Sequence, residues 1–228
     1  MTPAFEQDFQ VVLFDHVGCG NSDLNAYDYD KYSSLSGYAA DVVEIGRELN
    51  LTDGVFVAHS VSAMIGILAS IEAPDLFSEL ILIGPSPRYV NDDGYEGGFT
   101  RVQIEELLEF LDDNHMGWSA AMGPVIMGNA DRPELSEELV NSFCRTDPEI
   151  AKAFARVTFL SDNRSDLPRC NTRALVIQCK QDVIAQQGVG EYVRDHLPKG
   201  EMVVIDATGH CPNLSAPAQV ISAIKAFV

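Results

Sequence analysis

Three side chains that together can perform nucleophilic acyl transfer each follow a strand-like run of apolar residues. Ser60 comes after VFVAH, Asp182 after LVIQCKQ, and His210 after VVIDATG. In an open α/β sheet, functional groups gather where parallel strands end, so the three are expected to meet at one edge. A serine attacks a carbonyl poorly unless a histidine removes its proton, and the histidine needs a carboxylate to fix its tautomer. The pattern predicts a triad of Ser60, His210 and Asp182, with the backbone N–H of Val61 as an oxyanion donor.

The residues around Ser60 leave a second interpretation open. A nucleophile on a sharp strand-to-helix turn usually sits in G-x-S-x-G, whereas this sequence has Ala58 and Ser62 at the glycine positions. Ser60 could equally cap the helix that follows, Asp182 could be a loop residue, and His210 a turn residue. Their order along the chain, at three strand ends, favours a triad over three separate structural roles.

Near-continuous β-branched and aromatic runs alternate with helical periodicity along most of the chain. Such runs are typical of strands buried on both faces of a parallel sheet. The predicted strands are Phe9–Asp15, Gly54–His59, Leu80–Gly84, Ala174–Cys179 and Met202–Asp206. Predicted helices cover residues 35–51, 60–71, 190–197 and 218–228. This alternation predicts a single α/β domain over residues 1–228, built on a doubly wound, mostly parallel sheet.

The interval between Pro85 and Pro168 breaks this alternation and contains no strand-like run. Four segments within it have apolar residues at helical spacing or a helix start signal, such as Asp147 followed by Pro148. We interpret residues 85–168 as a four-helix lid inserted into a core formed by residues 1–84 and 169–228. Residues 91–150 carry 14 acidic and 3 basic side chains, which is typical of a solvated outer surface.

Charge and composition exclude several classes of function. The formal net charge is −19 at pH 7, which argues against nucleic acid, anionic membranes and other polyanions as partners. No leader-like or membrane-spanning run is recognisable, so a cytoplasmic location is expected. The five cysteines include no C-x-x-C pair and predict free thiols. The histidines lack ligand-like spacing and residues 15–23 lack a G-x-G-x-x-G motif, so neither a metal nor a nucleotide cofactor is expected.

Several sequence blocks resemble one branch of the α/β-hydrolases, which includes the bacterial stress regulator RsbQ and the plant receptors for strigolactones and karrikins. The blocks are VVLFDHVGCGNSDL, VFVAHSVSAMIGILASIEAPDLFSELILIGPSPRYVND, FCRTDP and GHCPNLSAP. The resemblance extends over essentially the whole chain. It implies an α/β-hydrolase fold, a triad of Ser60, Asp182 and His210, and an apolar pocket enclosed beneath the lid.

The resemblance implies a function in two alternative forms. One is an RsbQ-like serine hydrolase of small lipophilic esters or lactones that regulates stress signalling through a sigma factor, with a PAS-domain PP2C-type phosphatase as its partner. The other is a ligand-sensing or partner-activating regulatory protein on a hydrolase scaffold, in which catalysis is slow or vestigial. Both forms take a small apolar ligand.

The lid segments contain large apolar side chains that could line such a pocket. Aromatic and methionine side chains on helices also form ordinary core, so both interpretations stay open. His59 and Cys211, which flank two of the triad residues, are interpreted as packing groups. The pocket candidates are Phe99, Trp118, Met122 and Phe159.

The resemblance also marks a difference at the start of the chain. Members of the branch begin with a β-hairpin, a third strand and a short helix, and the loop after the third strand supplies a second oxyanion N–H. Those elements need roughly 40 to 50 residues, whereas this chain reaches its first strand-like run at Phe9. We therefore expect an N-terminally truncated hydrolase fold with an unpaired sheet edge, one oxyanion donor, low activity and a tendency to aggregate.

Overall fold

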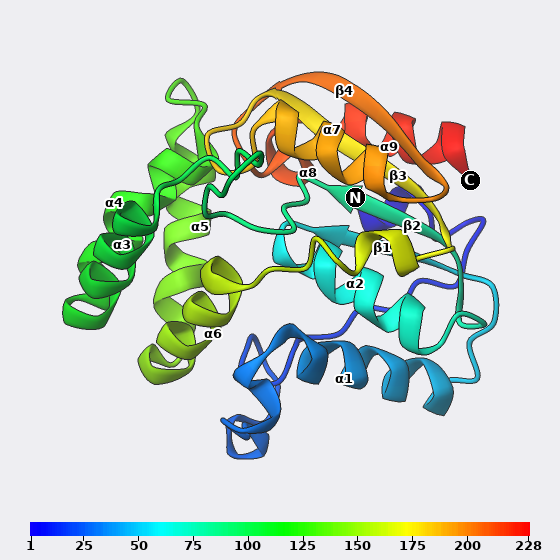
Figure 1. Cartoon of the computed structure of the whole chain (residues 1–228), viewed down its shortest axis with the longest axis horizontal. Coiled ribbons are helices and arrows are strands. Elements are labelled where there is room, and N and C mark those ends of the chain that lie inside the picture. The colour runs from blue at the N-terminus through cyan, green and yellow to red at the C-terminus, as the bar shows by residue number, and fades with distance from the viewer.

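A computed structural model describes residues Met1–Val228 and contains a four-stranded parallel sheet. Neighbouring strands pair directly, with Ala58 opposite Leu82 and Leu82 opposite Val176. Because all the strands run in the same direction, their carboxyl ends lie along one edge of the sheet (Figure 1). In spatial order the strands are β1 (Gly54–His59), β2 (Phe77–Ile83), β3 (Arg173–Gln181) and β4 (Gly200–Thr208).

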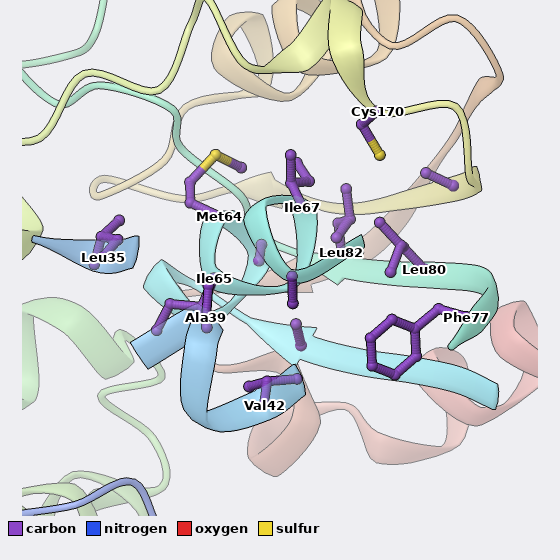
Figure 2. Close-up of a cluster of buried hydrophobic side chains, with 14 of the residues drawn as sticks. Leu35, Ala39, Val42, Met64, Ile65, Ile67, Phe77, Leu80, Leu82 and Cys170 are labelled. Atoms are coloured by element: carbon purple, nitrogen blue, oxygen red, sulfur yellow. The ribbon is translucent and has the colours of Figure 1, made fainter. Parts of the chain in front are cut away.

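Successive residues of a strand point to opposite faces of the sheet, and in the inner strands the residues on both faces are apolar. Helices therefore cover both faces. Leu80 and Leu82 of β2 face the core that also contains Met64 of α2 (Figure 2). Ile81 and Ile83 belong to a second core on the opposite face, which α9 closes. Burying one such side chain contributes about 1.5–3 kcal/mol. The core helices are α1 (Leu35–Glu48), α2 (Val61–Glu72), α7 (Gln187–His196), α8 (Pro212–Ser215) and α9 (Pro217–Phe227).

Four helices lie between β2 and β3, in the segment interpreted as a lid, and pack beside the sheet around a third apolar cluster (Figure 1). Their starts are fixed by side chains: Thr100 and Gln103 form a capping box, and Asp147 accepts hydrogen bonds from the first turn of the last lid helix. None of the helices in the chain has the length and apolar character needed to cross a membrane. The lid helices are α3 (Arg101–Asp113), α4 (His115–Met127), α5 (Pro133–Arg145) and α6 (Pro148–Leu160).

Short 3-10 helices complete the connections between the longer elements. The first of them lies at the N-terminus, and Met1 and Phe5 beside it pack against the α9 side of the sheet. The four 3-10 helices are η1 (Thr2–Ala4), η2 (Leu24–Ala26), η3 (Lys31–Ser33) and η4 (Leu167–Arg169).

The prediction of a strand at Phe9–Asp15 is wrong. Residues 10–15 make no backbone-to-backbone hydrogen bonds, and Leu13 within them is 77% exposed. β1 is an edge strand whose outer side pairs with no other strand. An apolar run becomes a strand only where a neighbour satisfies its backbone groups, and this segment has none. The alternation of strand and helix predicted for this part of the chain is therefore interrupted, although α1 itself forms.

The unpaired edge of β1 and the exposed apolar segment at residues 9–15 predict self-association that grows with concentration. Leu13 and Val57 present two of these apolar side chains, and Val57 is 46% exposed on β1. We expect Leu13→Lys and Val57→Lys each to raise the concentration at which oligomers form by about tenfold, which corresponds to roughly 1.4 kcal/mol of association free energy. Light scattering across a dilution series measures this change.

A matched control lies on the lid. Val102 is 61% exposed on α3, which is far from β1 in the fold (Figure 1). If Val102→Lys suppresses association as strongly as the two edge variants, added charge and not the edge explains the effect. A wild-type chain that stays monomeric at every concentration contradicts the prediction.

Candidate active site

Ser60 lies on a strained turn between β1 and α2. Its backbone adopts φ of 57° and ψ of −127°, a conformation with positive φ that is costly for a residue with a side chain. The turn is held by a hydrogen bond from the Ser60 N–H to the carbonyl oxygen of Ile83, 2.8 Å away. The Ser60 side chain makes no capping hydrogen bond to α2. Ser60 therefore occupies the N-cap position of α2 without its side chain capping the helix.

Close packing of strand and helix behind Ser60 depends on a glycine other than those of the expected motif. A Cβ at Gly66 would lie 2.6 Å from Cδ1 of Phe56, so β1 and α2 touch through this position. Ala58, which replaces the first glycine of the motif, is buried without disrupting β1. The sharp turn at Ser60 thus forms with Ala58 and Ser62 beside it.

The structure brings His210 and Asp182 to Ser60. Nε2 of His210 lies 2.7 Å from Oγ of Ser60, and Nδ1 of the same ring lies 2.8 Å from Oδ2 of Asp182. The other carboxylate oxygen of Asp182 accepts hydrogen bonds from the backbone N–H groups of Ile184 and Ala185. Because Asp182 accepts only, His210 carries its proton on Nδ1, and its Nε2 is free to accept the proton of Ser60. This is the geometry of an activated serine.

The loop that carries His210 is held in place by the lid. Gly209 has φ of +87°, and a Cβ there would lie 1.8 Å from the carbonyl oxygen of Met127. The His210 N–H donates to the carbonyl oxygen of Ile126 at 2.8 Å. The side-chain amide of Asn129 donates to the carbonyl oxygens of Met127 and Thr208. The end of α4 and the His210 loop therefore fix each other's positions.

His59 does more than pack beside the site. Its Nε2–H donates to the backbone carbonyl oxygen of His210 at 2.6 Å, and the two rings lie 4.9 Å apart. Burial, followed by the repulsive charge of His210, lowers the pKa of His59 to about 4. His59 is therefore a neutral donor near pH 7. Sequence reasoning interpreted it as a packing group because nothing in its spacing indicated which backbone atom it would face.

Tyr89 is the residue near Ser60 that sequence reasoning missed. It follows β2, and its hydroxyl lies 3.5 Å from Oγ of Ser60. The ring packs edge-on against Phe159, one of the predicted pocket residues, with ring centroids 5.1 Å apart. Tyr89 lies in one of the sequence blocks that carry the family resemblance, but nothing in its spacing indicated that its hydroxyl would face Ser60.

The N–H of Val61, the predicted oxyanion donor, is among the first N–H groups of α2, which have no acceptor within the helix.

The predicted pocket residues gather in the apolar cluster of the lid, to which Tyr89 also belongs. Trp118 is buried and packs against Phe143, with ring centroids 5.5 Å apart. Two surface clefts lie elsewhere, one between α1 and α6 and the other between α4 and α5. A ligand-contacting role for Phe99, Trp118, Met122 and Phe159 stays a prediction.

All five cysteines are free, as expected. Cys211, next to His210, is buried within the lid cluster, which agrees with its interpretation as a packing group. Burial raises the pKa of the Cys179 and Cys211 thiols to about 12, so neither is an activated nucleophile. No group of three or more histidine, cysteine, aspartate or glutamate side chains is placed to hold a metal ion.

The fold agrees with comparisons against known proteins. Residues 1–223 match the alpha/beta hydrolase family, and the chain belongs to that family. The chain is 38% identical over 224 residues to strigolactone esterase D14 of Arabidopsis thaliana, and the alignment covers 98% of this chain and 84% of the relative. It is 36% identical over 222 residues to the karrikin insensitive 2 receptor CA of Petunia hybrida, over 97% of this chain and 82% of the relative.

A solved structure gives the same result. A hydrolase from Oleispira antarctica superimposes with a TM-score of 0.97 at 40% sequence identity, over 100% of this chain and 84% of that chain. The predicted fold class is confirmed, as are the class of enzyme, a hydrolase, and the resemblance to the receptor branch.

The lowered pKa of His59 predicts how stability depends on pH. Between pH 6.5 and about 4 the unfolded chain binds a proton at His59 that the folded chain does not. The free energy of unfolding should therefore fall as the pH drops through this window, and His59 should account for roughly 2–3 kcal/mol of the fall. His59→Gln keeps an N–H donor but cannot titrate, so its unfolding free energy should fall less steeply. Denaturant unfolding at pH 4, 5, 6 and 7 measures the difference.

His196→Gln provides the control, because His196 is an exposed histidine on α7. Its pH dependence should match that of the wild type. Identical slopes for the wild type and His59→Gln would show that His59 is not held neutral by the fold.

Proposed function

We propose that the protein is a serine hydrolase in which Ser60 attacks an ester or lactone, His210 is the general base and acid, and Asp182 orients His210. The observation that carries this proposal is the continuous line of hydrogen bonds from Ser60 Oγ through the His210 ring to Asp182, with heavy-atom distances of 2.7 and 2.8 Å. The strained turn at Ser60 does not need this line of hydrogen bonds for its own stability. The line therefore favours a catalytic role for the three residues.

The proposed reaction proceeds through an acyl-serine. A bond forms between Oγ of Ser60 and the acyl carbon while the serine proton moves to Nε2 of His210, and the carbonyl oxygen becomes an oxyanion beside the N–H of Val61. The bond to the leaving-group oxygen then breaks, and that oxygen takes the proton from His210. Water, activated by His210 in the same way, hydrolyses the acyl-serine and restores the free enzyme.

Small lipophilic esters or lactones are the proposed substrates. The apolar lid cluster beside Ser60, which contains Tyr89 and Phe159, favours an apolar acyl or alcohol group. The net charge of −19 disfavours anionic substrates. A relative that is 38% identical is named as a strigolactone esterase, which agrees with a small lactone as the ligand.

Active-site labelling tests the proposed nucleophile. A fluorophosphonate probe should label the wild type at one site per chain, and Ser60→Ala should abolish both labelling and hydrolysis of p-nitrophenyl butyrate, the latter by at least about a thousandfold. Ser62→Ala, two residues away on α2, is the matched control and should keep both. Retention of turnover in Ser60→Ala would refute the proposed nucleophile.

A regulatory role is the second candidate function, and the 36% identical relative named as a karrikin insensitive 2 receptor favours it. In this form the protein binds a small apolar ligand and activates a partner. The resemblance to RsbQ suggests a PAS-domain PP2C-type phosphatase of a stress-signalling pathway as that partner. A cytoplasmic location belongs to this proposal, and five free cysteines are in keeping with a reducing compartment.

Phosphatase activation by purified wild type and Ser60→Ala separates the two candidates. Activation that survives Ser60→Ala, together with labelling but no multiple turnover in the wild type, favours the sensor. Activation that requires Ser60 favours an enzyme whose product is the signal.

A further inference from the structure

Tyr89 is held rigidly beside Ser60 by the segment that follows β2. Its side chain is 2% exposed, and its ring packs against Phe159 on α6. The backbone on either side is pinned: the carbonyl oxygen of Tyr89 accepts from the N–H of Phe99, and the carbonyl oxygen of Arg88 accepts from the hydroxyl of Tyr95 at 2.7 Å. The position of the Tyr89 hydroxyl is therefore set by the fold.

That hydroxyl is a donor without a good acceptor. Its polar neighbour is Oγ of Ser60 at 3.5 Å, whereas hydrogen bonds between oxygens usually measure about 2.7–2.8 Å. Ser60 directs its own proton to His210, so its Oγ can only accept a hydrogen bond from Tyr89, and at 3.5 Å that bond is long and weak. Burial raises the pKa of Tyr89 to about 12, which keeps the phenol protonated at neutral pH. A buried, protonated phenol of this kind gains a hydrogen-bond acceptor when a substrate oxygen is placed beside Ser60.

The position of Tyr89 determines which substrate oxygen lies within reach of its hydroxyl. Tyr89 follows β2, which lies between β1 with Ser60 and β3 with Asp182. Asp182 lies near enough to Tyr89 for its negative charge to add to the rise in the pKa of the phenol, which favours an approach to Ser60 from the side of His210 and Asp182, whereas Val61 begins α2. The leaving-group oxygen must lie on the His210 side, because His210 supplies its proton.

We propose that Tyr89 is a catalytic hydrogen-bond donor to the leaving-group oxygen of the ester or lactone, an inference that rests on the proposed serine hydrolase reaction. As the bond between the acyl carbon and this oxygen breaks, the bond's electron pair moves to the oxygen. The Tyr89 hydroxyl donates a hydrogen bond to the developing charge and keeps its own proton. His210 Nε2 transfers its proton to the same oxygen, which leaves as the alcohol. The interaction strengthens only as charge develops, so it lowers the barrier more than it strengthens binding.

Leaving-group dependence tests this role. Tyr89→Phe keeps the ring that packs on Phe159 and removes only the hydroxyl. Its kcat/KM should fall by about tenfold for ethyl butyrate, whose poor leaving group needs the hydrogen bond, and by less than about twofold for p-nitrophenyl butyrate. Both substrates share one acyl group, and kcat/KM reports the acylation step for each. A general displacement of the site would instead lower both values equally.

Tyr32→Phe is the matched control. Tyr32 is 3% exposed and also loses a hydroxyl hydrogen bond, but its hydroxyl donates to Asp41 on α1 and makes no contact with Ser60 or with the segment of Tyr89. It should not change the ratio of the two kcat/KM values.

The possible outcomes distinguish this inference from the proposed function. Equal losses for both esters in Tyr89→Phe, or the same selective loss in Tyr32→Phe, overturn the role of Tyr89 while turnover that requires Ser60 stands. A wild type without turnover that requires Ser60 overturns the proposed function, and the role of Tyr89 falls with it.

Discussion

The parallel pairing of β1, β2, β3 and β4 is the constraint on which the site depends. Ser60, Asp182 and His210 are separated by 122 residues and then by 28 along the chain, yet each follows a strand that ends at the same edge of the sheet. Apolar cores on both faces hold the strands in this arrangement. Hydrogen-bond distances of 2.7 and 2.8 Å between three side chains can persist only where the backbone beneath them is held this firmly.

A second set of contacts joins the site to the lid. The end of α4 bonds to the loop of His210 through the carbonyl oxygen of Ile126, and His59 holds the carbonyl oxygen of His210 from the opposite side of the residue. The backbone of His210 is thus fixed at both its N–H and its C=O group. Any displacement of α4 must be shared with His210, so ligand contacts within the lid and the geometry of proton transfer are physically connected.

The segment at residues 9–15 shows where local sequence patterns mislead. Its apolar residues are as typical of a strand as those of β1, and the predicted helix α1 follows it. A strand nevertheless exists only when a second strand satisfies its N–H and C=O groups, which is a property of the whole fold. The strands β1 to β4 were predictable to within a few residues, because each contains a nearly continuous apolar run that alternates with stretches of helical periodicity.

Sequence alone determined the order of serine, acid and histidine and their place at strand ends, because strand and helix periodicity is a local property of the chain. It also determined the four lid helices, whose caps and apolar faces lie within short segments. Tertiary structure alone decided that Ser60 is strained and does not cap α2, that His59 supports His210, and that the hydroxyl of Tyr89 faces Ser60. These depend on contacts between residues 23 to 151 positions apart, and no periodicity or motif spans such a separation.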